Sequence, residues 1–167
     1  MQSIILIGNG SSLLDRKMGN EIDKFDKVVR FNSFKIQGFE EYAGTKTDIW
    51  FTVNGCHKNE INEFDEVIFH SWARLENCKM YADLKRYRDI KKIKMEQIQE
   101  IGINHPSTGL IAIFHFLKSF PEITITGFDW WNRKKHHYGD DEPRGTLHKP
   151  ILELQKINSL GNQIKFL

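Results

Sequence analysis

A short aliphatic run that ends at a glycine turn limits the possible folds of this chain more than any other feature. Ile4–Ile7 is apolar at every position, without the polar–apolar alternation of a half-exposed strand, and Gly8-Asn9-Gly10 follows at once. Such a run is typical of a parallel strand that is buried on both faces. We expect further strands in the same sheet at Lys27–Phe31, Asp48–Val53, Glu66–Phe69, Lys92–Met95, Ile123–Thr126 and Gln163–Phe166.

Helical patterns separate several of these strands. Thr108–Leu117 is apolar nearly all round, which predicts a buried helix. Leu75–Tyr87 has helical spacing, and Pro150 suits the first turn of a last helix through Ile157. The alternation predicts one α/β domain over residues 1–167, a Rossmann-like, doubly wound, mostly parallel sheet flanked by helices. Ligands of such sheets bind outside the carboxyl ends of the strands.

Charge and cysteine content narrow the function classes. The net charge of +2 argues against nucleic acid as the main partner. A local basic run is either a solvated helix face or a patch for an anionic membrane or glycolipid, and it comprises Lys85, Arg86, Arg88, Lys91, Lys92 and Lys94. Cys56 and Cys78 do not make a disulfide framework, and the first residues have neither signal-peptide nor anchor character. We therefore expect a reducing, cytoplasmic compartment.

The first candidate site follows the first strand. Gly8-Asn9-Gly10-Ser11-Ser12-Leu13 is not a dinucleotide fingerprint, because Leu13 stands where the third glycine belongs, and it is not a P-loop. A tight turn and a nucleotide site both remain open. The same holds for Asn9 and for Asn32, which ends the next strand, because an amide can bind a ligand or satisfy a turn.

The second candidate site is the start of the apolar helix, where Ser107-Thr108-Gly109 could bind an anion or simply cap the helix. Aromatic Trp130 and Trp131 could pack at the sheet end or stack on a sugar ring.

Histidines in the polar stretch from Asp129 to Thr146 and just after it are the remaining candidates. His136 and His137 precede Tyr138, and with Asp140 and Asp141 they could form a metal site. His148 precedes the helix that begins near Pro150, whose positive end disfavours an imidazolium and favours a neutral general base. Glu153 lies in the first turn, where it either pairs with the helix dipole or orients the site.

Taken in order, these segments resemble the four sialylmotifs of the family 29 sialyltransferases. The resemblance rests on Ile4–Leu13 with Val28–Asn32 and Gly44–Asp48, on His105–Gly109 with Thr126–Asp129, on His136–Tyr138, and on His148 with Glu153. It implies a GT-A-like variant of the Rossmann fold. It also implies a CMP-sugar donor, such as CMP-sialic acid, and no metal or other cofactor.

The resemblance also implies roles for single residues. Asn9 and Asn32 contact the cytidine monophosphate, and Ser107, Thr108 and Gly109 hold the nucleotide or its sugar. His137, with Tyr138 beside it, offsets charge on the departing phosphate, and His148 is the base. Ile4 and Ile5 stand where a motif cysteine is expected, which suggests a short, anchorless, microbial or viral member, cytoplasmic or peripheral to an inner membrane.

The expected reaction inverts the sugar configuration as sialic acid, or a related 2-keto acid sugar, moves to a hydroxyl of a glycan or glycolipid. Transfer of Kdo from its CMP donor is an alternative, and so is a reduced, non-catalytic nucleotide-sugar-binding module. A metal-dependent hydrolase using His136, His137, Asp140 and Asp141 is a third. The acceptor, the linkage, the oligomeric state and the role of residues 55–104 stay open.

Overall fold

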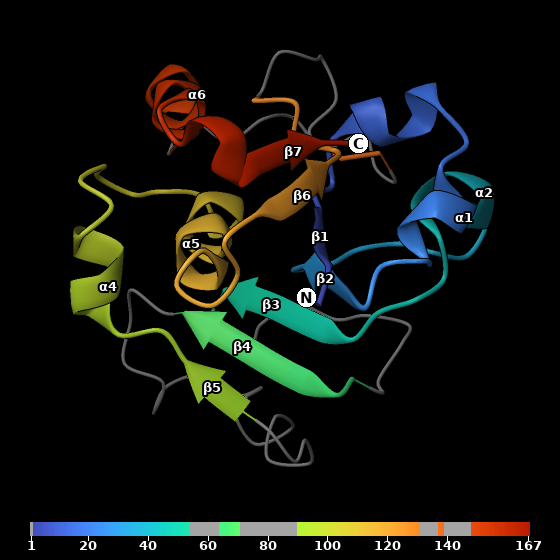
Figure 1. Cartoon of the computed structure of the whole chain (residues 1–167), viewed down its shortest axis with the longest axis horizontal. Helices are drawn as coiled ribbons and strands as arrows, with labels where there is room; N and C mark the ends of the chain where they lie inside the picture. Colours follow the sequence, from blue (N-terminus) through green and yellow to red (C-terminus); the bar gives the residue numbers. More distant parts are fainter. Residues whose placement is uncertain (1, 54–63, 71–89, 131–136, 139–147) are drawn as a thin grey trace.

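The chain forms a parallel β-sheet with helices on both faces (Figure 1). The computed structural model describes residues 2–53, 64–70, 90–130, 137–138 and 148–167. Within them the sheet has the order β5-β4-β3-β2-β1-β6-β7, and every neighbouring pair is parallel. The strands are β1 (Ile4–Ile7), β2 (Lys27–Phe31), β3 (Ile49–Val53), β4 (Glu66–His70), β5 (Ile90–Lys92), β6 (Ile123–Thr126) and β7 (Ile164–Phe166). The predicted α/β class is confirmed.

The strand order places the switch point of the sheet beside β1. The chain runs outward from β1 to β5 and then returns to add β6 on the other side of β1. The turns that follow β1 and β6 therefore leave the sheet side by side, in the position where ligands of doubly wound sheets bind.

Helices on the two faces bury both sides of β1. Ile5 and Ile7 pack with η1 (Ser11–Asp15), α1 (Gly19–Ile22) and α2 (Glu40–Ala43). Ile4 and Leu6 belong to the larger core cluster with α4 (Met95–Gln99), α5 (Thr108–Phe116) and α6 (Pro150–Asn158). The short helix η3 (Gly161–Gln163) connects α6 to β7. This two-sided burial explains the unbroken apolar run, because successive strand side chains point to opposite faces.

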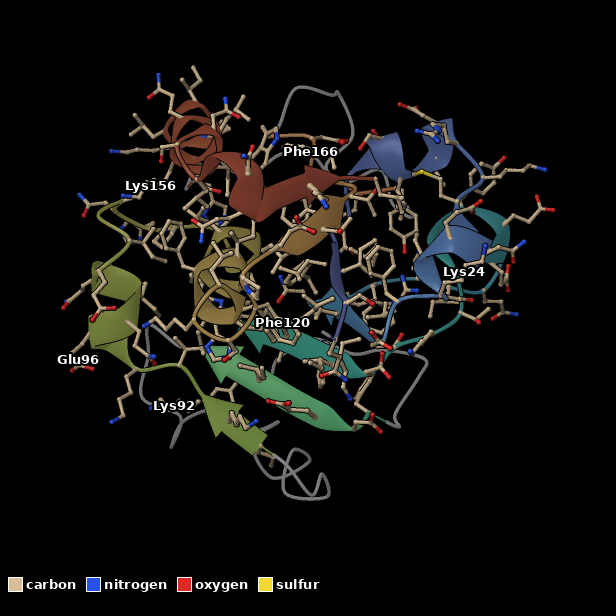
Figure 2. All side chains as sticks on the ribbon, viewed as in Figure 1. Lys24, Lys92, Glu96, Phe120, Lys156 and Phe166 are labelled. Carbon is tan, nitrogen blue, oxygen red and sulfur yellow. The ribbon has the colours of Figure 1, made fainter. Side chains whose placement is uncertain are left out.

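Among the described residues, the Asp, Glu, Lys and Arg side chains other than Arg30 and Glu153 are not buried. Figure 2 shows Lys24, Lys92, Glu96 and Lys156 projecting away from the sheet. Among the described residues, the large apolar side chains with substantial exposure are Ile151, Leu152 and Phe166. No described helix is both long enough and apolar enough to cross a bilayer.

Most predicted boundaries agree with the structure to within one residue, and one prediction is wrong. Lys92–Met95 is not a strand, because β5 ends at Lys92 and α4 begins at Met95. The side chain of Gln97 accepts a hydrogen bond from the Lys94 backbone N–H at 3.0 Å and so stabilises the start of α4. The Leu75–Tyr87 helix, Cys56, Cys78 and the basic run from Lys85 to Arg88 lie outside the described residues.

The segment between β2 and β3 makes hydrogen bonds that fix it to β2. Arg30 is fully buried, and its guanidinium donates to the carbonyls of Ala43 and Lys46 and to the Thr47 hydroxyl at 2.7–3.1 Å. Burial lowers the pKa of Arg30 to about 10, which still leaves it charged near neutral pH. Asp48 accepts from the Val28 backbone N–H at 2.7 Å. The segment Gly44–Asp48 therefore supports the fold.

Candidate active site

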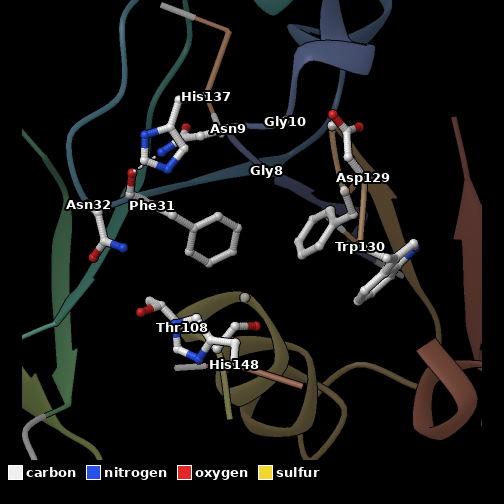
Figure 3. Close-up of a pocket in the computed structure, with 14 residues that line it drawn as sticks. Gly8, Asn9, Gly10, Phe31, Asn32, Thr108, Asp129, Trp130, His137 and His148 are labelled. Atoms are coloured by element: carbon white, nitrogen blue, oxygen red, sulfur yellow. Dashed lines mark hydrogen bonds between the residues drawn. The ribbon is translucent and has the colours of Figure 1, made fainter. Parts of the chain in front are cut away.

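A cavity opens where the turns after β1, β2 and β6 meet the start of α5 (Figure 3). Of the residues that the sialylmotif resemblance assigns to the nucleotide, the phosphate or the base, all except Tyr138 line it. The lining residues are Gly8, Asn9, Gly10, Phe31, Asn32, Ser107, Thr108, Gly109, Gly127, Phe128, Asp129, Trp130, His137 and His148. The cavity thus unites segments that lie more than a hundred residues apart in the sequence.

The floor of the cavity is a close backbone contact between the turns after β1 and β6. Gly8 N–H donates to the Thr126 carbonyl, and Gly10 N–H donates to the Gly127 carbonyl, each at 2.8 Å. A Cβ at Gly8 would lie 2.3 Å from the Gly127 carbonyl oxygen, which no side chain tolerates. Gly127 also has a φ of +69°, in the region that favours glycine. These glycines are needed first for the contact between the two turns.

Asn9 connects the first turn to the end of β2. Its side-chain nitrogen donates to the carbonyls of Phe31 at 3.0 Å and Ser33 at 3.3 Å. The side-chain nitrogen of Asn9 is therefore fully used in stabilising the turn. Within the described residues its side-chain oxygen has no hydrogen-bond donor, so that oxygen is the group that Asn9 can offer to a ligand.

Asn32 occupies a left-handed backbone position at the end of β2, with a φ of +48°. Its side-chain oxygen accepts from the Val53 N–H at 3.0 Å, and its carbonyl accepts from the Trp50 indole at 2.9 Å. Figure 3 shows its amide nitrogen on the cavity side. Asn32 thus has the opposite polarity to Asn9, because it turns a donor toward the cavity.

Ser107 is the N-cap of α5, as predicted, and its hydrogen-bonding groups are all in use. Its hydroxyl accepts from the Leu110 N–H at 3.2 Å and donates to a Glu153 carboxylate oxygen at 2.6 Å. Its backbone N–H donates to the other Glu153 oxygen at 2.8 Å. Ser107 lines the cavity, but its polar groups stabilise the helix start.

Glu153 joins α6 to α5 from a fully buried position. Burial raises the pKa of its carboxyl group, while the two hydrogen bonds from Ser107 and the nearby His148 act in the opposite direction. Dipole pairing, one of the two roles expected from the sequence, does not explain this burial. The contact with Ser107 fits an orienting role, because it fixes the helix start that lines the cavity.

Thr108 has a partner that the sequence did not suggest. Its hydroxyl oxygen lies 3.0 Å from Nε2 of His70, the last residue of β4. His70 is almost completely buried, and its pKa is lowered to about 4, first by burial and then by the nearby His148. The signal that could have found it is positional, because a histidine at the carboxyl end of a central parallel strand faces the ligand edge of the sheet.

His148 stands beside the start of α5, and its Nδ1 makes a hydrogen bond to the main chain. Its Nδ1 lies 2.9 Å from the carbonyl oxygen of His105. A carbonyl oxygen only accepts, so Nδ1 carries a hydrogen, and Nε2 is the nitrogen at which a neutral ring would accept a proton. This arrangement is the one that a general base needs.

Tyr138 anchors the short segment that carries His137. Its N–H donates to the Asn9 carbonyl at 2.9 Å, and its hydroxyl donates to the Lys35 carbonyl. The ring is buried against Phe39, with 5.1 Å between ring centroids. Burial raises the pKa of the phenol. The structure thus does not bring Tyr138 to the cavity wall, and its observed contacts hold His137 in place.

Aromatic side chains form one wall of the cavity. Phe128 packs against Phe31 and Trp130, with centroid separations of 5.8 and 5.6 Å. A Cβ at Gly109 would lie 2.6 Å from the Phe128 ring, so this glycine is required for packing. Trp130 therefore both packs at the sheet end and lines the cavity. Trp131 lies outside the described residues.

Asp129, in the turn after β6, connects this turn to η1, which follows β1. Its carboxylate accepts from the Ser12 N–H at 3.2 Å and from the Ser11 hydroxyl at 3.3 Å. The first and second motif segments are therefore held together by a side chain whose role the sequence did not indicate.

The two candidate histidines lie on opposite sides of the cavity. Figure 3 shows His137 beside Asn9 and Gly10, and His148 beside Thr108 across the opening. One imidazole can therefore face a leaving group while the other faces an incoming hydroxyl.

Among the residues that the structure describes, no three His, Cys, Asp or Glu side chains lie close enough together to hold a metal ion. His136, Asp140 and Asp141 of the alternative metal set lie outside them.

Comparison with known proteins agrees with this geometry. Residues 1–93, more than half of the chain, match the family model described as glycosyltransferase family 29 (sialyltransferase). The chain belongs to this family. The matched region includes β1, β2 and their turns, which supply Gly8, Asn9, Gly10, Phe31 and Asn32 to the cavity.

Two relatives illustrate the range of the family. Mouse lactosylceramide alpha-2,3-sialyltransferase is 25% identical over 208 residues, covering 98% of this chain and 49% of its own. The beta-1,6-galactosyltransferase GALT29A of Arabidopsis thaliana is 23% identical over 203 residues, covering 96% and 51%. The chain thus spans about half the length of the curated relatives that it matches.

A solved structure has the same fold. A mammalian sialyltransferase crystallised with Gal-beta-1-3GalNAc-ortho-nitrophenol superposes with a TM-score of 0.77 at 22% identity. The alignment covers 99% of this chain and 69% of that one. The fold is therefore that of the sialyltransferases, the GT-A-like variant that the sequence predicts.

Proposed function

We propose that the protein transfers sialic acid from CMP-sialic acid to a hydroxyl group of a glycan, with inversion and without a metal ion. The observation that carries this proposal is the placement of the two histidines. His148 has its Nδ1 bound to a carbonyl, which makes Nε2 the basic nitrogen of the neutral ring, and His137 faces it across the cavity.

In the proposed reaction, Nε2 of His148 removes the proton of the acceptor hydroxyl. The oxygen attacks the anomeric carbon from the face opposite the phosphate, and a new carbon–oxygen bond forms as the bond to the phosphate breaks. His137 lies on the far side and offsets the charge that builds on the departing cytidine monophosphate. The proton ends on His148, and the nucleotide leaves as the anion.

The donor is held by groups of both polarities. We propose that the side-chain oxygen of Asn9, which is not engaged within the described residues, accepts a hydrogen bond from the CMP-sugar. The amide nitrogen of Asn32 donates one to it. Thr108 and Gly109 lie at the start of α5, where free N–H groups and the helix dipole favour an anion. Ser107 acts indirectly, by fixing this helix start.

The acceptor class is the next part of the proposal. The mouse relative is named for lactosylceramide, a glycolipid. We propose a galactose-ended glycan or glycolipid for this chain, with the ring near Trp130 at the cavity wall. A peripheral membrane contact would follow if the acceptor is a lipid, and nucleic acid is not a proposed partner.

Two alternatives differ in the sugar or in turnover. The Arabidopsis relative is named as a galactosyltransferase, so the family alone does not decide the donor sugar, and CMP-Kdo remains the alternative within the CMP-linked donors. A non-catalytic CMP-sugar-binding module is the alternative outside the enzymes, because the chain covers about half of the relatives.

The compartment is also a proposal. Ile4 and Ile5 in place of a motif cysteine, with only two cysteines in the sequence, favour a reducing, cytoplasmic setting. Thiol titration of denatured, unreduced protein should find both thiols free, and finding neither in fresh monomer would contradict this setting. The expected microbial or viral origin has no support from the relatives named above, which come from an animal and a plant.

Transfer to lactose or lactosylceramide tests the function directly. Purified protein is incubated with CMP-sialic acid, and in parallel with CMP-Kdo, in the presence of EDTA. The proposal predicts sialylated product and free cytidine monophosphate in the first reaction only. Product from CMP-Kdo alone would change the donor, and dependence on added magnesium would remove the metal-independent mechanism. CMP binding without turnover on any glycan would favour the binding module.

A further inference from the structure

A buried histidine outside the four segments that resemble sialylmotifs contacts a residue of the cavity wall. His70 ends β4, has only 1% of its surface exposed, and reaches a single group that lines the cavity, the hydroxyl of Thr108 at 3.0 Å. Its other ring nitrogen, Nδ1, is buried and has no hydrogen-bond partner within the described part of the chain.

We propose that His70 is a positioning residue that makes the Thr108 hydroxyl a hydrogen-bond donor toward an anionic oxygen of the substrate. The proposal rests on the proposed function, because it names a group that binds the CMP-sugar. It depends on which nitrogen of His70 carries the hydrogen.

The unpartnered Nδ1 decides between the two neutral forms of His70. If the hydrogen were on Nδ1, a buried N–H donor would have no acceptor, and buried N–H groups without partners are rare in native proteins. With the hydrogen on Nε2, the unpartnered atom is a lone pair, which native proteins tolerate more often. Burial also lowers the pKa of His70, so the ring is neutral near pH 7. The hydrogen therefore lies on Nε2, which donates to Thr108.

The direction of this bond fixes what the Thr108 hydroxyl can do. Once its oxygen accepts from His70, its own hydrogen must point elsewhere. His70 is its hydrogen-bond partner among the described residues, and the hydroxyl lines the cavity at the start of α5. The hydroxyl is thus prepared to donate into the cavity, beside helix N–H groups that also favour an anion. In a CMP-sugar the matching group is either a phosphate oxygen or the carboxylate of the sugar.

Histidine labelled with nitrogen-15 tests the orientation without any ligand. A long-range proton–nitrogen correlation spectrum identifies which ring nitrogen of His70 carries the hydrogen, with His70→Gln as the assignment control. The proposal predicts the Nε2–H form near pH 7. The Nδ1–H form would overturn it, because Thr108 would then donate to His70.

Calorimetric titration of the variants tests the consequence. His70→Leu removes the donor, whereas His70→Gln keeps an N–H near the position of Nε2. We expect His70→Leu to bind cytidine monophosphate about tenfold more weakly than wild type, and His70→Gln to recover most of this loss. Cytidine, which lacks the phosphate, should bind all three proteins equally. In a Thr108→Val background, His70→Leu should cause no further loss.

The ligands separate the two anions. Weaker binding of cytidine monophosphate identifies the phosphate, while an unchanged affinity for it with weaker binding of CMP-sialic acid identifies the carboxylate. A folded His70→Leu protein that binds all of them as wild type does would overturn the proposal. If wild type binds neither nucleotide, the proposed function fails, and the labelled-histidine spectrum still decides the orientation. If His70→Leu does not fold, Thr108→Val takes its place. Thr108→Val should then show the weaker binding expected of His70→Leu, while His70→Gln should bind nearly as well as wild type.

Discussion

The two sides of the cavity are held together by different physical means. On the side of β1 and β6, the turns meet backbone to backbone through Gly8, Gly10 and Gly127, and the partly buried Asp129 adds hydrogen bonds to the first turn. On the side of α5, the connections run through the side chains of Glu153 and His70, both buried and both with shifted pKa values.

This difference means that the two sides should respond to different changes, one to added side-chain volume and the other to pH. The glycine side should respond strongly to an added methyl group and little to pH, because it depends on a close approach of main chains. The α5 side should tolerate changes of shape better and should respond to pH, because two buried groups there change charge only at a cost.

The largest effect is expected from Gly127→Ala. Its φ of +69° is unfavourable for alanine, and the new Cβ would lie 2.5 Å from the Gly8 carbonyl oxygen. Together these should lower the free energy of unfolding by about 4 kcal/mol. Gly38→Ala is the matched control, since Gly38 has a φ of +82° with nothing within 4 Å of a Cβ, and it should cost about 1 kcal/mol. Urea unfolding measures both, and equal losses would contradict the close-contact account.

The next effect is a pH dependence on the α5 side. Burial holds the pKa of His70 at about 4, below the ordinary 6.5, so between these values the unfolded chain binds a proton that the folded protein does not. The free energy of unfolding should therefore fall as pH drops through this window, by about 3 kcal/mol from His70.

His70→Leu should remove this contribution, as urea unfolding at a series of pH values would show. Some slope should persist, because burial also lowers the pKa of His115. An unaltered acid slope in His70→Leu would show that His70 does not titrate as proposed.

Removal of the buried carboxylate gives a smaller loss. Glu153→Leu leaves the Ser107 N–H and hydroxyl without their acceptor and should cost about 2 kcal/mol. Glu153→Gln should cost less, because its side-chain oxygen can still accept from the N–H. Burial raises the pKa of Glu153, so the wild type loses stability as pH rises through that raised value. The penalty of Glu153→Leu should accordingly be larger on the acid side, and a penalty that grows toward alkaline pH would contradict this.

The smallest effect is expected from Tyr138→Phe. The loss of the hydroxyl bond to Lys35 should cost about 1 kcal/mol in thermal or urea unfolding. Tyr42→Phe is the control, since the Tyr42 hydroxyl makes no hydrogen bond within the described residues and should cost nothing measurable. If Tyr138 positions His137, its loss should also slow transfer while the affinity for acceptor stays the same. Unchanged transfer would limit Tyr138 to a structural role.

The sequence predicts the inner strands of the sheet well because they are largely buried, unlike the edge strands β5 and β7. Ile4–Ile7 and Ile123–Thr126 have the predicted bounds, since few other structures accommodate such runs next to glycine turns. The short elements η1, α1, α2 and α4 were not predicted. They are one or two turns long, too short for a periodic pattern, and tertiary contacts rather than propensity maintain them.

The candidate site was predictable where it follows strand ends and motif segments, and not where partners lie far apart in sequence. Asn9 and Asn32 line the cavity, as their places after β1 and β2 predict, and Thr108 and His148 line it as members of the motif segments. The hydrogen bond between His70 and Thr108 depends on how α5 lies relative to β4. The burial of Glu153 depends on how α6 packs against the start of α5. No local pattern contains either contact.

The most direct test of the central claim compares His148→Ala with wild type in one assay series, with circular dichroism to confirm the fold. His148 is proposed to act only on the acceptor proton, so kcat should fall on the order of a hundred- to ten-thousand-fold while the Kd for cytidine monophosphate stays the same. His137→Ala, on the opposite side, should both slow transfer and weaken nucleotide binding. A His148→Ala protein that transfers sialic acid at the wild-type rate, or that loses nucleotide binding together with turnover, would contradict the division of roles across the cavity.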